Sequence, residues 1–202
     1  MLARQFQQRF YTPEEYLELE DRAEHKSEYL DGEIVALTGT SLNHNRVAKN
    51  IAFAIEGEIS RTPCEVFFAE IKVWIEARNY FTYPDVMVLC GKKQLYKNRS
   101  DTVTNPQIII EVLSKSTERY DRNDKFYAFW TLDSLAEYVL VDQYRMRVEY
   151  FKQTSEKEWM LRVFTQPDET LVLQSINLEI PLSDIYHRVE WEEETETADG
   201  KA

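Results

Sequence analysis

Two carboxylates stand on strand-like segments where their types and spacing could support metal chemistry. Asp85 follows Pro84 and opens the apolar run VMVLC, and Glu111 interrupts the β-branched run IIIEVL. If the two strands are neighbours, both side chains converge at one end of a sheet, and such oxygen ligands suit Mg²⁺ or Mn²⁺. A buried carboxylate is costly unless something compensates it. We therefore expect a bound cation, rather than another side chain, to compensate Glu111.

Each carboxylate also has an ordinary structural explanation. Aspartate after proline is common in loops, so Asp85 could simply begin a turn or a strand. Glu111 has no obvious cationic partner nearby in the sequence, and buried carboxylates with perturbed pKa values concentrate at functional sites. The residues therefore favour a functional role more strongly for Glu111 than for Asp85.

A site that cleaves a phosphodiester benefits from a cation near the scissile phosphate or the nucleophile. Leu113 occupies the position two residues after Glu111, so the nearest lysines are Lys115, in the following turn, and Lys125, on a helix-like segment. Lys125 lies four residues after Asp121, on the same stripe of the helix. An exposed salt bridge between Asp121 and Lys125 is an equally simple interpretation.

The elements that must position these residues include both helix and strand patterns. A capping hydroxyl and Pro13 start a helix that runs to about residue 23, and Asp31-Gly32 joins two strands in a hairpin. Polar caps at 41–43 start a helix that ends before Pro63. Further strands are expected at 66–70, 71–77, 83–90 and 107–114, a helix at 117–132, strands at 137–143, 147–152, 159–166 and 170–176, and a short turn at 182–184. This order predicts one α/β domain of the α+β type, with a mixed central β-sheet flanked by helices.

The composition indicates one globular domain followed by an acidic end. The chain has 202 residues, of which 43% are hydrophobic and 30% are charged, and its formal net charge is −12. That length supports one core but not two full ones. We expect residues 1–190 to form the domain and residues 191–202, which are rich in Glu, to form a disordered acidic tail. The negative charge predicts that any binding to nucleic acid is weak or local.

The sequence also predicts where the protein works. It has no apolar run long enough for a membrane span, and its first residues lack the apolar core of a signal peptide. The two cysteines, Cys64 and Cys90, show no spacing typical of a structural zinc site. We expect a cytoplasmic protein that is not associated with a membrane.

Several segments together resemble the Uma-type restriction endonuclease family of the PD-(D/E)XK nuclease superfamily. They are SEYLDGEIVAL, the early His44, YPDVMVL, IIIEVLSKST with the following ERYDRNDKFY, and EYVLVD, and the similarity covers residues 12–152. This resemblance implies a restriction-endonuclease-like fold. It also implies an Mg²⁺- or Mn²⁺-dependent endonuclease that hydrolyses DNA phosphodiester bonds.

Carried over to this sequence, the family pattern assigns the metal ligands to Asp85 and Glu111, with the main-chain carbonyl of Val112 completing the set. Lys125 matches the lysine that is displaced from the strand to the following helix in this family. The sequence departs from the superfamily pattern at Leu113, where a lysine is usual. Activity therefore depends on whether Lys125 reaches the site.

Three further residues could belong to the same site. His44 matches a family histidine at the start of the long helix and could contact phosphate or activate water. A first-turn histidine that only packs or hydrogen-bonds locally is the alternative. Glu28 matches a family glutamate before the Asp-Gly turn and could supply a third acidic group, or it could simply face solvent beside Lys26. Glu70 could line the cleft, although Glu70-Ile71-Lys72 precedes the Pro-Asp pair and has the wrong order for the motif.

Three classes of function remain open on the sequence. The first is an active DNA endonuclease, and the second is a catalytically inactive nuclease-fold module for binding or assembly, which Leu113 and the negative charge favour. The third is a glycosidase that uses Asp85 and Glu111 as its acid–base pair. A homodimer would bring two active sites to the two DNA strands, but no sequence motif shows an interface or a DNA-recognition module.

Overall fold

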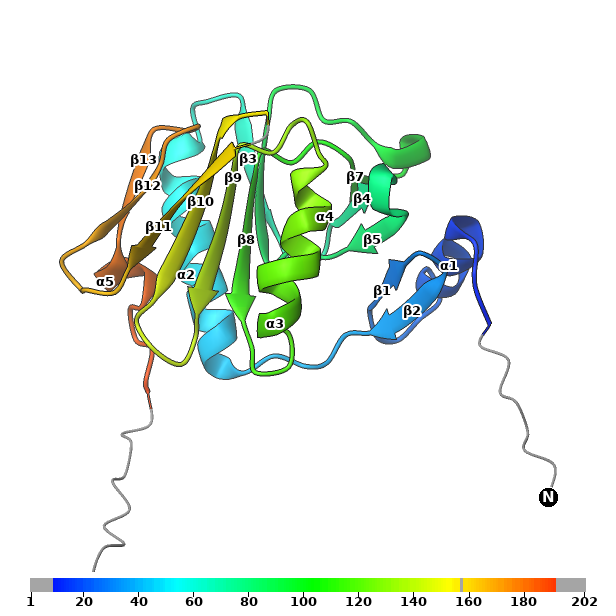
Figure 1. Ribbon diagram of the computed structural model, residues 1–202, viewed down its shortest axis with the longest axis horizontal. Helices are drawn as coiled ribbons and strands as arrows, with labels where there is room; N and C mark the ends of the chain where they lie inside the picture. The colour runs from blue at the N-terminus through cyan, green and yellow to red at the C-terminus, as the bar shows by residue number, and fades with distance from the viewer. Residues whose placement is uncertain (1–8, 157, 192–202) are drawn as a thin grey trace, which may run out of the picture.

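The computed structural model describes residues 9–156 and 158–191 (Figure 1). In chain order the elements are α1 (Pro13–Glu20), β1 (Ser27–Leu30), β2 (Glu33–Ala36), α2 (Leu42–Ile59), β3 (Cys64–Phe68), β4 (Lys72–Ile75), η1 (Glu76–Arg78), β5 (Tyr80–Thr82), β6 (Val86–Cys90), η2 (Tyr96–Asn98), β7 (Thr102–Val103), β8 (Ile108–Leu113), α3 (Glu118–Tyr120), the π-helical η3 (Asp121–Lys125), α4 (Phe126–Trp130), β9 (Glu137–Asp142), β10 (Val148–Ser155), β11 (Glu158–Phe164), β12 (Thr170–Leu173), β13 (Leu178–Pro181) and α5 (Leu182–Ile185).

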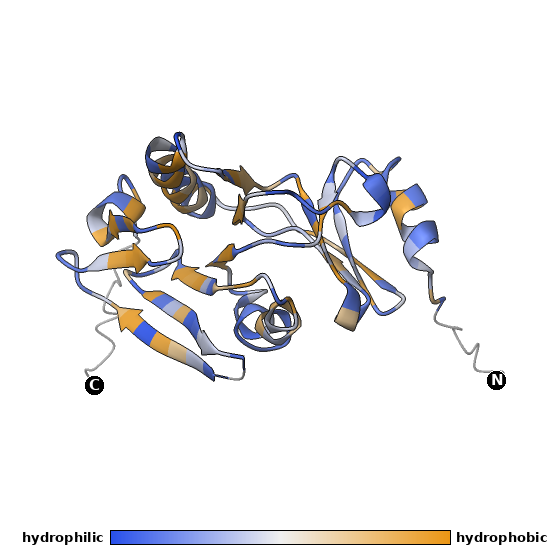
Figure 2. Cartoon of the chain, turned by 90° about the horizontal axis from the view of Figure 1, so that it is seen from above, coloured by the Kyte–Doolittle hydropathy of each residue, from blue (hydrophilic) through white to orange (hydrophobic). Residues whose placement is uncertain are grey.

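A six-stranded sheet in the order β11-β10-β9-β8-β6-β3 forms the centre of the molecule. Strands β8 and β9 run parallel, and the other neighbours in this sheet run antiparallel. Helix α2 covers one face, α3 and α4 cover the other, and hydrophobic strands lie between them (Figures 1 and 2). A five-stranded sheet in the order β2-β1-β5-β4-β7 lies to one side, and β12 pairs with β13. The predicted α+β fold with a mixed central sheet is confirmed.

Strand β8 alternates its side chains between the two helical layers. Ile110 and Val112 pack in the hydrophobic cluster that contains α2, whereas Ile109 and Leu113 pack in the cluster that contains α4. Because successive side chains of a strand point to opposite faces, Glu111 is directed toward α3, η3 and α4. The strand pattern thus fixes the face on which Glu111 lies.

The two sheets are joined by a long hairpin that is interrupted where it passes from one sheet to the other. Strand β3 pairs with β6 through Phe68 and Val86, and β4 pairs with β5 through Val73 and Thr82, so the four residues 69–72 lie opposite the three residues 83–85. One extra residue on one strand is a β-bulge, which bends the strand. Asp85 therefore lies at the junction of the two sheets.

The bulge contains a strained turn at Ala69. The φ angle of Ala69 is 62°, and the N–H of Glu70 donates a hydrogen bond of 2.7 Å to the carbonyl of Phe68. The left-handed region is unfavourable for a residue with a Cβ atom. The N–H of Ala69 also donates to the carbonyl of Asp85 at 3.2 Å, so the strained turn is attached directly to the aspartate segment.

Several local predictions are confirmed, and others need correction. Thr12 forms a full capping box with Glu15, and both residues of the Asp31-Gly32 turn have positive φ. The helix expected at 117–132 is divided into α3, η3 and α4, because η3 has a π-helical hydrogen-bonding pattern. The short strands β5, β7 and β13 were not predicted.

The cysteines and the C-terminal segment complete the description. Cys64 and Cys90 are register partners across β3 and β6 and are joined by a disulfide.

In the described ranges, no helix combines the length and apolar character needed to cross a membrane. Trp191, the first residue of the expected tail, packs against Tyr186 in a tilted arrangement with 5.4 Å between ring centroids, and residues 192–202 lie outside the described residues. The tail and the cytoplasmic location stay predictions.

Two alanine-to-glycine substitutions test the strain at Ala69. Ala54→Gly, in the interior of α2, should lower the free energy of unfolding by about 1 kcal/mol. Ala69→Gly should leave it unchanged or raise it, because glycine relieves a left-handed conformation that costs an L-residue about 1–2 kcal/mol. Both variants add the same freedom to the unfolded chain, so their difference in urea denaturation reports the folded state. Equal losses in the two variants would exclude strain at Ala69.

Candidate functional site

The five candidate site residues come together at the junction of the two sheets. Glu28 comes from β1, Asp85 precedes β6, Glu111 lies on β8, His44 lies in the first turn of α2, and Lys125 ends η3. Strands β6 and β8 are antiparallel neighbours with Val86 opposite Ile110, which brings Asp85 to the level of Glu111. The sequence made convergence of the two carboxylates depend on neighbouring strands, and β6 and β8 meet that condition.

Asp85 is held by the neighbouring strand β8 and by helix α2. Its Oδ2 atom accepts a hydrogen bond of 2.8 Å from the backbone N–H of Val112 and lies 3.2 Å from Nε2 of His44. The His44 backbone N–H donates to Oγ of Ser41, the N-cap residue of α2, at 3.1 Å. The cap thus fixes the first turn of α2 so that the imidazole meets the carboxylate.

The environment of His44 favours its protonated form. Burial alone would lower the pKa of His44, but the hydrogen bond and charge of Asp85, with a backbone hydrogen bond involving Val112, raise it above the ordinary histidine value. His44 is therefore directly involved in the carboxylate cluster, and the alternative that it only packs locally is wrong.

Lys125 compensates Glu111 from the helical layer. Its Nζ atom lies 2.9 Å from Oε1 of Glu111, 3.4 Å from Oε1 of Glu28 and 3.9 Å from Oδ1 of Asp121. Lys125 is 6% exposed and Asp121 is 4% exposed, so their contact is not a surface salt bridge. The sequence favoured a bound cation over a side chain as the compensating charge. A lysine fourteen residues later supplies such a charge, and a bound metal stays a prediction.

The π-helical turn explains how Lys125 and Asp121 both reach the site. They are the last and first residues of η3, and both are buried. A π-helical turn is wider than an α-helical turn and is often found at functional sites. The sequence placed both residues on one helical stripe, but it did not predict this change of helix type or the presence of Asp121 in the site.

Glu28 is fixed by hydrogen bonds from β5. Its Oε2 accepts from the hydroxyl of Tyr80 at 2.7 Å, and its Oε1 accepts from the hydroxyl of Thr82 at 2.5 Å. The backbone N–H of Tyr83 also approaches Oε1 at 3.4 Å. Glu28 is 8% exposed, so the alternative that it simply faces solvent is wrong.

Glu70 does not belong to this group. Its side chain is 73% exposed and forms an ion pair of 2.5 Å with Lys26. Lys26 also donates to the carbonyl of Ala69 at 2.6 Å. Of the two residues considered as a third acidic group, the structure brings Glu28 to the cluster and leaves Glu70 at the surface.

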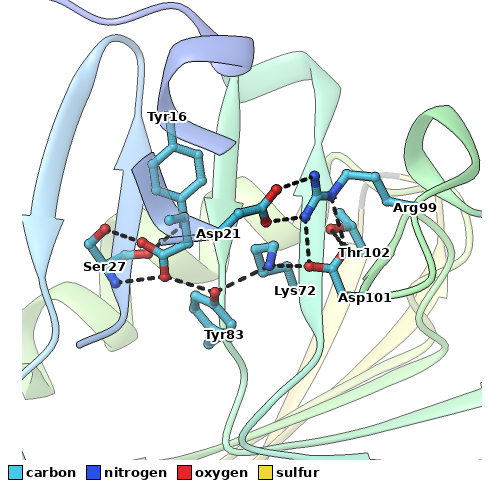
Figure 3. A network of polar contacts seen from close by, with 9 residues as sticks. Tyr16, Asp21, Ser27, Lys72, Tyr83, Arg99, Asp101 and Thr102 are labelled. Atoms are coloured by element: carbon cyan, nitrogen blue, oxygen red, sulfur yellow. Dashed lines mark hydrogen bonds and ion pairs between the residues drawn. The ribbon is translucent and has the colours of Figure 1, made fainter. Parts of the chain in front are cut away.

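A second polar network fixes the segment that leads into Asp85 (Figure 3). The Tyr83 hydroxyl donates to Glu20 at 2.8 Å and receives a contact of 3.3 Å from Nζ of Lys72, which pairs with Asp101 at 2.6 Å. Arg99 bridges Asp101 to Asp21. The network ties Tyr83, two residues before Asp85, to α1, β4 and the loop before β7. No pattern of spacing in the sequence indicated it.

The cluster carries more negative than positive groups. Four carboxylates, those of Glu28, Asp85, Glu111 and Asp121, share Lys125 and His44. Burial raises the pKa of Glu111 well above its usual value, with Lys125 opposing and Asp85 and Asp121 reinforcing the shift. Burial also raises the pKa of Asp121. The ionised forms of these two carboxylates are therefore incompletely compensated, and an additional cation is favoured beside them.

The basicity of Lys125 is set by the same carboxylates. Burial alone would lower its pKa, but Glu111 and Glu28 outweigh burial and hold the pKa well above the ordinary lysine value. Lys125 is therefore a fixed positive charge at neutral pH. It can stabilise negative charge on a ligand but cannot act as a base there.

The donor set of the cluster suits a hard divalent cation in part. Oε1 of Glu111 is buried and lies 2.9 Å from Nζ of Lys125, but within residues 9–156 and 158–191 it has no contact with hydrogen-bond geometry. In the same ranges, no group of three or more His, Cys, Asp or Glu side chains is arranged to hold a metal ion. Magnesium is commonly held by one or two carboxylates, with waters and substrate phosphates completing its shell. Asp85 and Glu111 are two carboxylates of the kind that this mode of binding uses, and their role as metal ligands stays a prediction.

Comparisons with known proteins identify the family and the fold. The family model Uma2, described as "Putative restriction endonuclease", matches residues 13–183. "Uncharacterized protein sll1609" of Synechocystis sp. is 40% identical over 151 residues, which cover 74% of this chain and 85% of that protein. "Uncharacterized protein slr1290" of the same organism is 31% identical over 175 residues, which cover 87% and 90%.

A solved structure shares the fold. The crystal structure of "a putative nuclease belonging to DUF820" from Anabaena variabilis superimposes with a TM-score of 0.72 at 18% sequence identity. The match covers 87% of this chain and 97% of the other. At this level of identity the comparison establishes the architecture and leaves the chemistry to the residues of the site.

Removal of the Lys125 ammonium group should destabilise the protein strongly. Lys125→Met leaves buried carboxylates unpaired, and we expect a loss of about 3–5 kcal/mol in the free energy of unfolding. Adding Glu111→Gln to Lys125→Met should recover part of this loss. Urea denaturation of both single variants and the double variant measures the coupling. Lys93→Met, which breaks an exposed pair with Glu65, is the control and should change stability little. Additive effects at Lys125 and Glu111 would contradict the pairing.

The His44 titration tests the contact with Asp85. The raised folded pKa means that the pair contributes stability that is complete below the unfolded pKa of about 6.5. This contribution is lost as the pH rises through the folded pKa. In Asp85→Asn the pKa of His44 should fall, because burial then acts without the opposing charge. NMR titration of the imidazole in both proteins measures the change. An unchanged pKa would show that Asp85 is not the controlling partner.

Proposed function

This chain belongs to the Uma2 family of restriction-endonuclease-like proteins, and from that membership and its site we propose that it is a divalent-metal-dependent endonuclease that hydrolyses DNA phosphodiester bonds. The observation that carries the proposal is the contact of 2.9 Å between Lys125 and Glu111. Leu113 stands where the superfamily motif has lysine, so an active site requires a lysine from elsewhere. Lys125 meets that requirement from the following helix.

The carboxylates would hold the cofactor, which is Mg²⁺ or Mn²⁺. Asp85 and Glu111 would bind it with the Val112 carbonyl, and Glu28 would add negative charge behind them. When bound, such a cation supplies charge neutralisation at phosphoryl oxygens and makes an attacking water more acidic. Restriction-endonuclease-like proteins generally use a divalent metal, which agrees with the surplus of carboxylates.

Lys125 and His44 would act on the substrate from two sides. Lys125 is held as a fixed positive charge, so it would stabilise the negative charge that develops on the phosphate. His44 lies at the first turn of α2 and could hold a proton close to Asp85 or contact the phosphate directly. The carboxylates orient both cations, and binding of a metal would compete with them for the same oxygens.

The overall charge limits how DNA would bind. A net charge of −12 opposes general attraction to a polyanion, so contact with DNA would be local and sensitive to salt. Cytoplasmic location and a homodimer that cuts both strands are further expectations of the proposal.

A catalytically inactive nuclease-fold module is the second candidate. It is favoured by the internal pairing of the cluster, since Lys125 contacts three carboxylates that would otherwise be free to bind a metal. In this case the protein would bind partners but cleave no DNA. Family membership favours a nuclease fold over the glycosidase interpretation.

Two buried glutamates provide a matched test of the activity. Supercoiled plasmid DNA is incubated with the full chain in Mg²⁺ or Mn²⁺, and nicking is followed on agarose gels. Glu111→Gln should reduce cleavage at least about 100-fold, because it removes a metal ligand. Glu137→Gln changes another buried glutamate, on β9 and outside the cluster, and should leave cleavage unchanged.

Three outcomes would decide against the endonuclease. Cleavage that persists in chelator, or that falls equally in the two glutamine variants, would separate the activity from this site. Absence of cleavage in wild type across plasmid, linear and single-stranded DNA, with either metal, would favour the inactive module. Calorimetry with Mn²⁺ then shows whether the carboxylates still bind a metal.

A further inference from the structure

A buried glutamine lies behind the candidate site, and its two polar atoms bridge the layers that carry the site residues. Gln143 directly follows β9 and is only 2% exposed. We infer that Gln143 is a positioning residue that holds His44 against Asp85 through the cap of α2. The inference rests on the proposed function for its catalytic consequence, but its geometric part stands independently.

The first link joins Gln143 to the strand that carries Glu111. The Nε2 atom of Gln143 donates a hydrogen bond of 2.7 Å to the carbonyl of Leu113 at the end of β8. A carbonyl only accepts hydrogen bonds, so the amide nitrogen must face Leu113 and the amide oxygen must face the other way. This link fixes the orientation of the whole side chain.

The second link joins Gln143 to the helix that carries His44. Oγ of Ser41 donates a short hydrogen bond to Oε1 of Gln143 and accepts the backbone N–H of His44 at 3.1 Å. The serine hydroxyl therefore has two tasks, as the cap of α2 and as a donor to the glutamine. A residue that only caps the helix would perform the first task without the second.

The remaining links close a ring around the site. His44 Nε2 lies 3.2 Å from Asp85 Oδ2, and that oxygen accepts the N–H of Val112, the residue next to Leu113. The path therefore runs from β8 through Gln143 and Ser41 to His44, and returns through Asp85 to β8. Movement of α2 relative to β8 would break at least one link, so the ring sets the distance between imidazole and carboxylate.

The surroundings of Gln143 support a fixed orientation. The indole N–H of Trp191 donates to the backbone carbonyl of Gln143 at 3.1 Å. Both side-chain polar atoms of Gln143 are paired, one with a donor and one with an acceptor. A reversed amide would place its oxygen against the Leu113 carbonyl, and two acceptors cannot bond each other.

A pair of isosteric substitutions at Ser41 separates capping from the link to Gln143. Asn and Asp are both good caps and can accept the His44 N–H. Ser41→Asn keeps a donor for Oε1 of Gln143, whereas Ser41→Asp places a carboxylate against that oxygen. Gln143→Leu removes the link at its other end. The three variants and wild type are compared by crystal structure and by kinetics of plasmid nicking with Mn²⁺.

We expect the variants to fall into two groups. In Ser41→Asp and Gln143→Leu, the distance from His44 Nε2 to Asp85 Oδ2 lengthens and kcat falls about 10–100-fold, as for residues that orient metal ligands indirectly. KM for the plasmid stays within about twofold, because no DNA contact is removed. In Ser41→Asn, both the distance and kcat stay near the wild-type values.

The two readouts distinguish failure of this inference from failure of the proposed function. If the crystal structures show the same His44–Asp85 distance in Ser41→Asp as in Ser41→Asn, the positioning role is overturned, whatever the activity. Equal loss of kcat in the two isosteric variants overturns it as well. If wild type cleaves no DNA but the distance changes only in Ser41→Asp and Gln143→Leu, the positioning role holds and the endonuclease proposal fails.

Discussion

One buried ammonium group joins the two halves of this protein. Lys125 contacts Glu111 on β8 of the six-stranded sheet and Glu28 on β1 of the five-stranded sheet. Any one of these charges left alone in the interior would be strongly destabilising, so each makes the others necessary. The position of α3, η3 and α4 against both sheets follows from this requirement. The packing of Phe126 and Phe129 beside it then fixes the helical layer on the apolar side.

The junction of the sheets is built to let carboxylates from both of them meet. In a continuous hairpin, Asp85 would be an ordinary paired strand residue. The bulge at 69–72 instead interrupts the pairing between Phe68–Val86 and Val73–Thr82, so Asp85 lies in the unpaired segment just before β6. Ala69 adopts a left-handed conformation there and is bonded to the Asp85 carbonyl. Local strain at such positions is commonly tolerated where it orients a functional group. The Tyr83 network on the other side keeps the same segment from relaxing.

The sequence was sufficient for features that depend on local chemistry. The Asp31-Gly32 turn, the cap at Ser41 and the period-two pattern of β8 each act over a few residues, and each led to a correct element. The patterns placed Asp85 and Glu111 at strands but left open whether those strands are neighbours, which the pairing of β6 with β8 establishes. The family resemblance then named Lys125, which spacing alone left as an even choice.

The errors concern interactions between residues that are far apart in the chain. Nothing near Glu111 in the sequence indicates that a lysine from η3 compensates it, because the π-helical turn that aims Lys125 arises from tertiary packing. The ring through Ser41 and Gln143 joins residues 102 positions apart. Such links depend on how layers stack, and single-sequence patterns do not contain that information.

The charge of the site has a consequence for the order of events in the proposed reaction. Four carboxylates against Lys125 and His44 leave the cluster negative, and the chain as a whole is also negative. Without a bound metal, a phosphodiester that approached this cluster would be repelled both by the cluster and by the negative charge of the whole chain. A divalent cation would reverse the local sign before DNA arrives, so binding of metal and of DNA should be coupled and mutually reinforcing. The carboxylates would then have two roles. They would bind the metal, and in its absence they would repel DNA from the site.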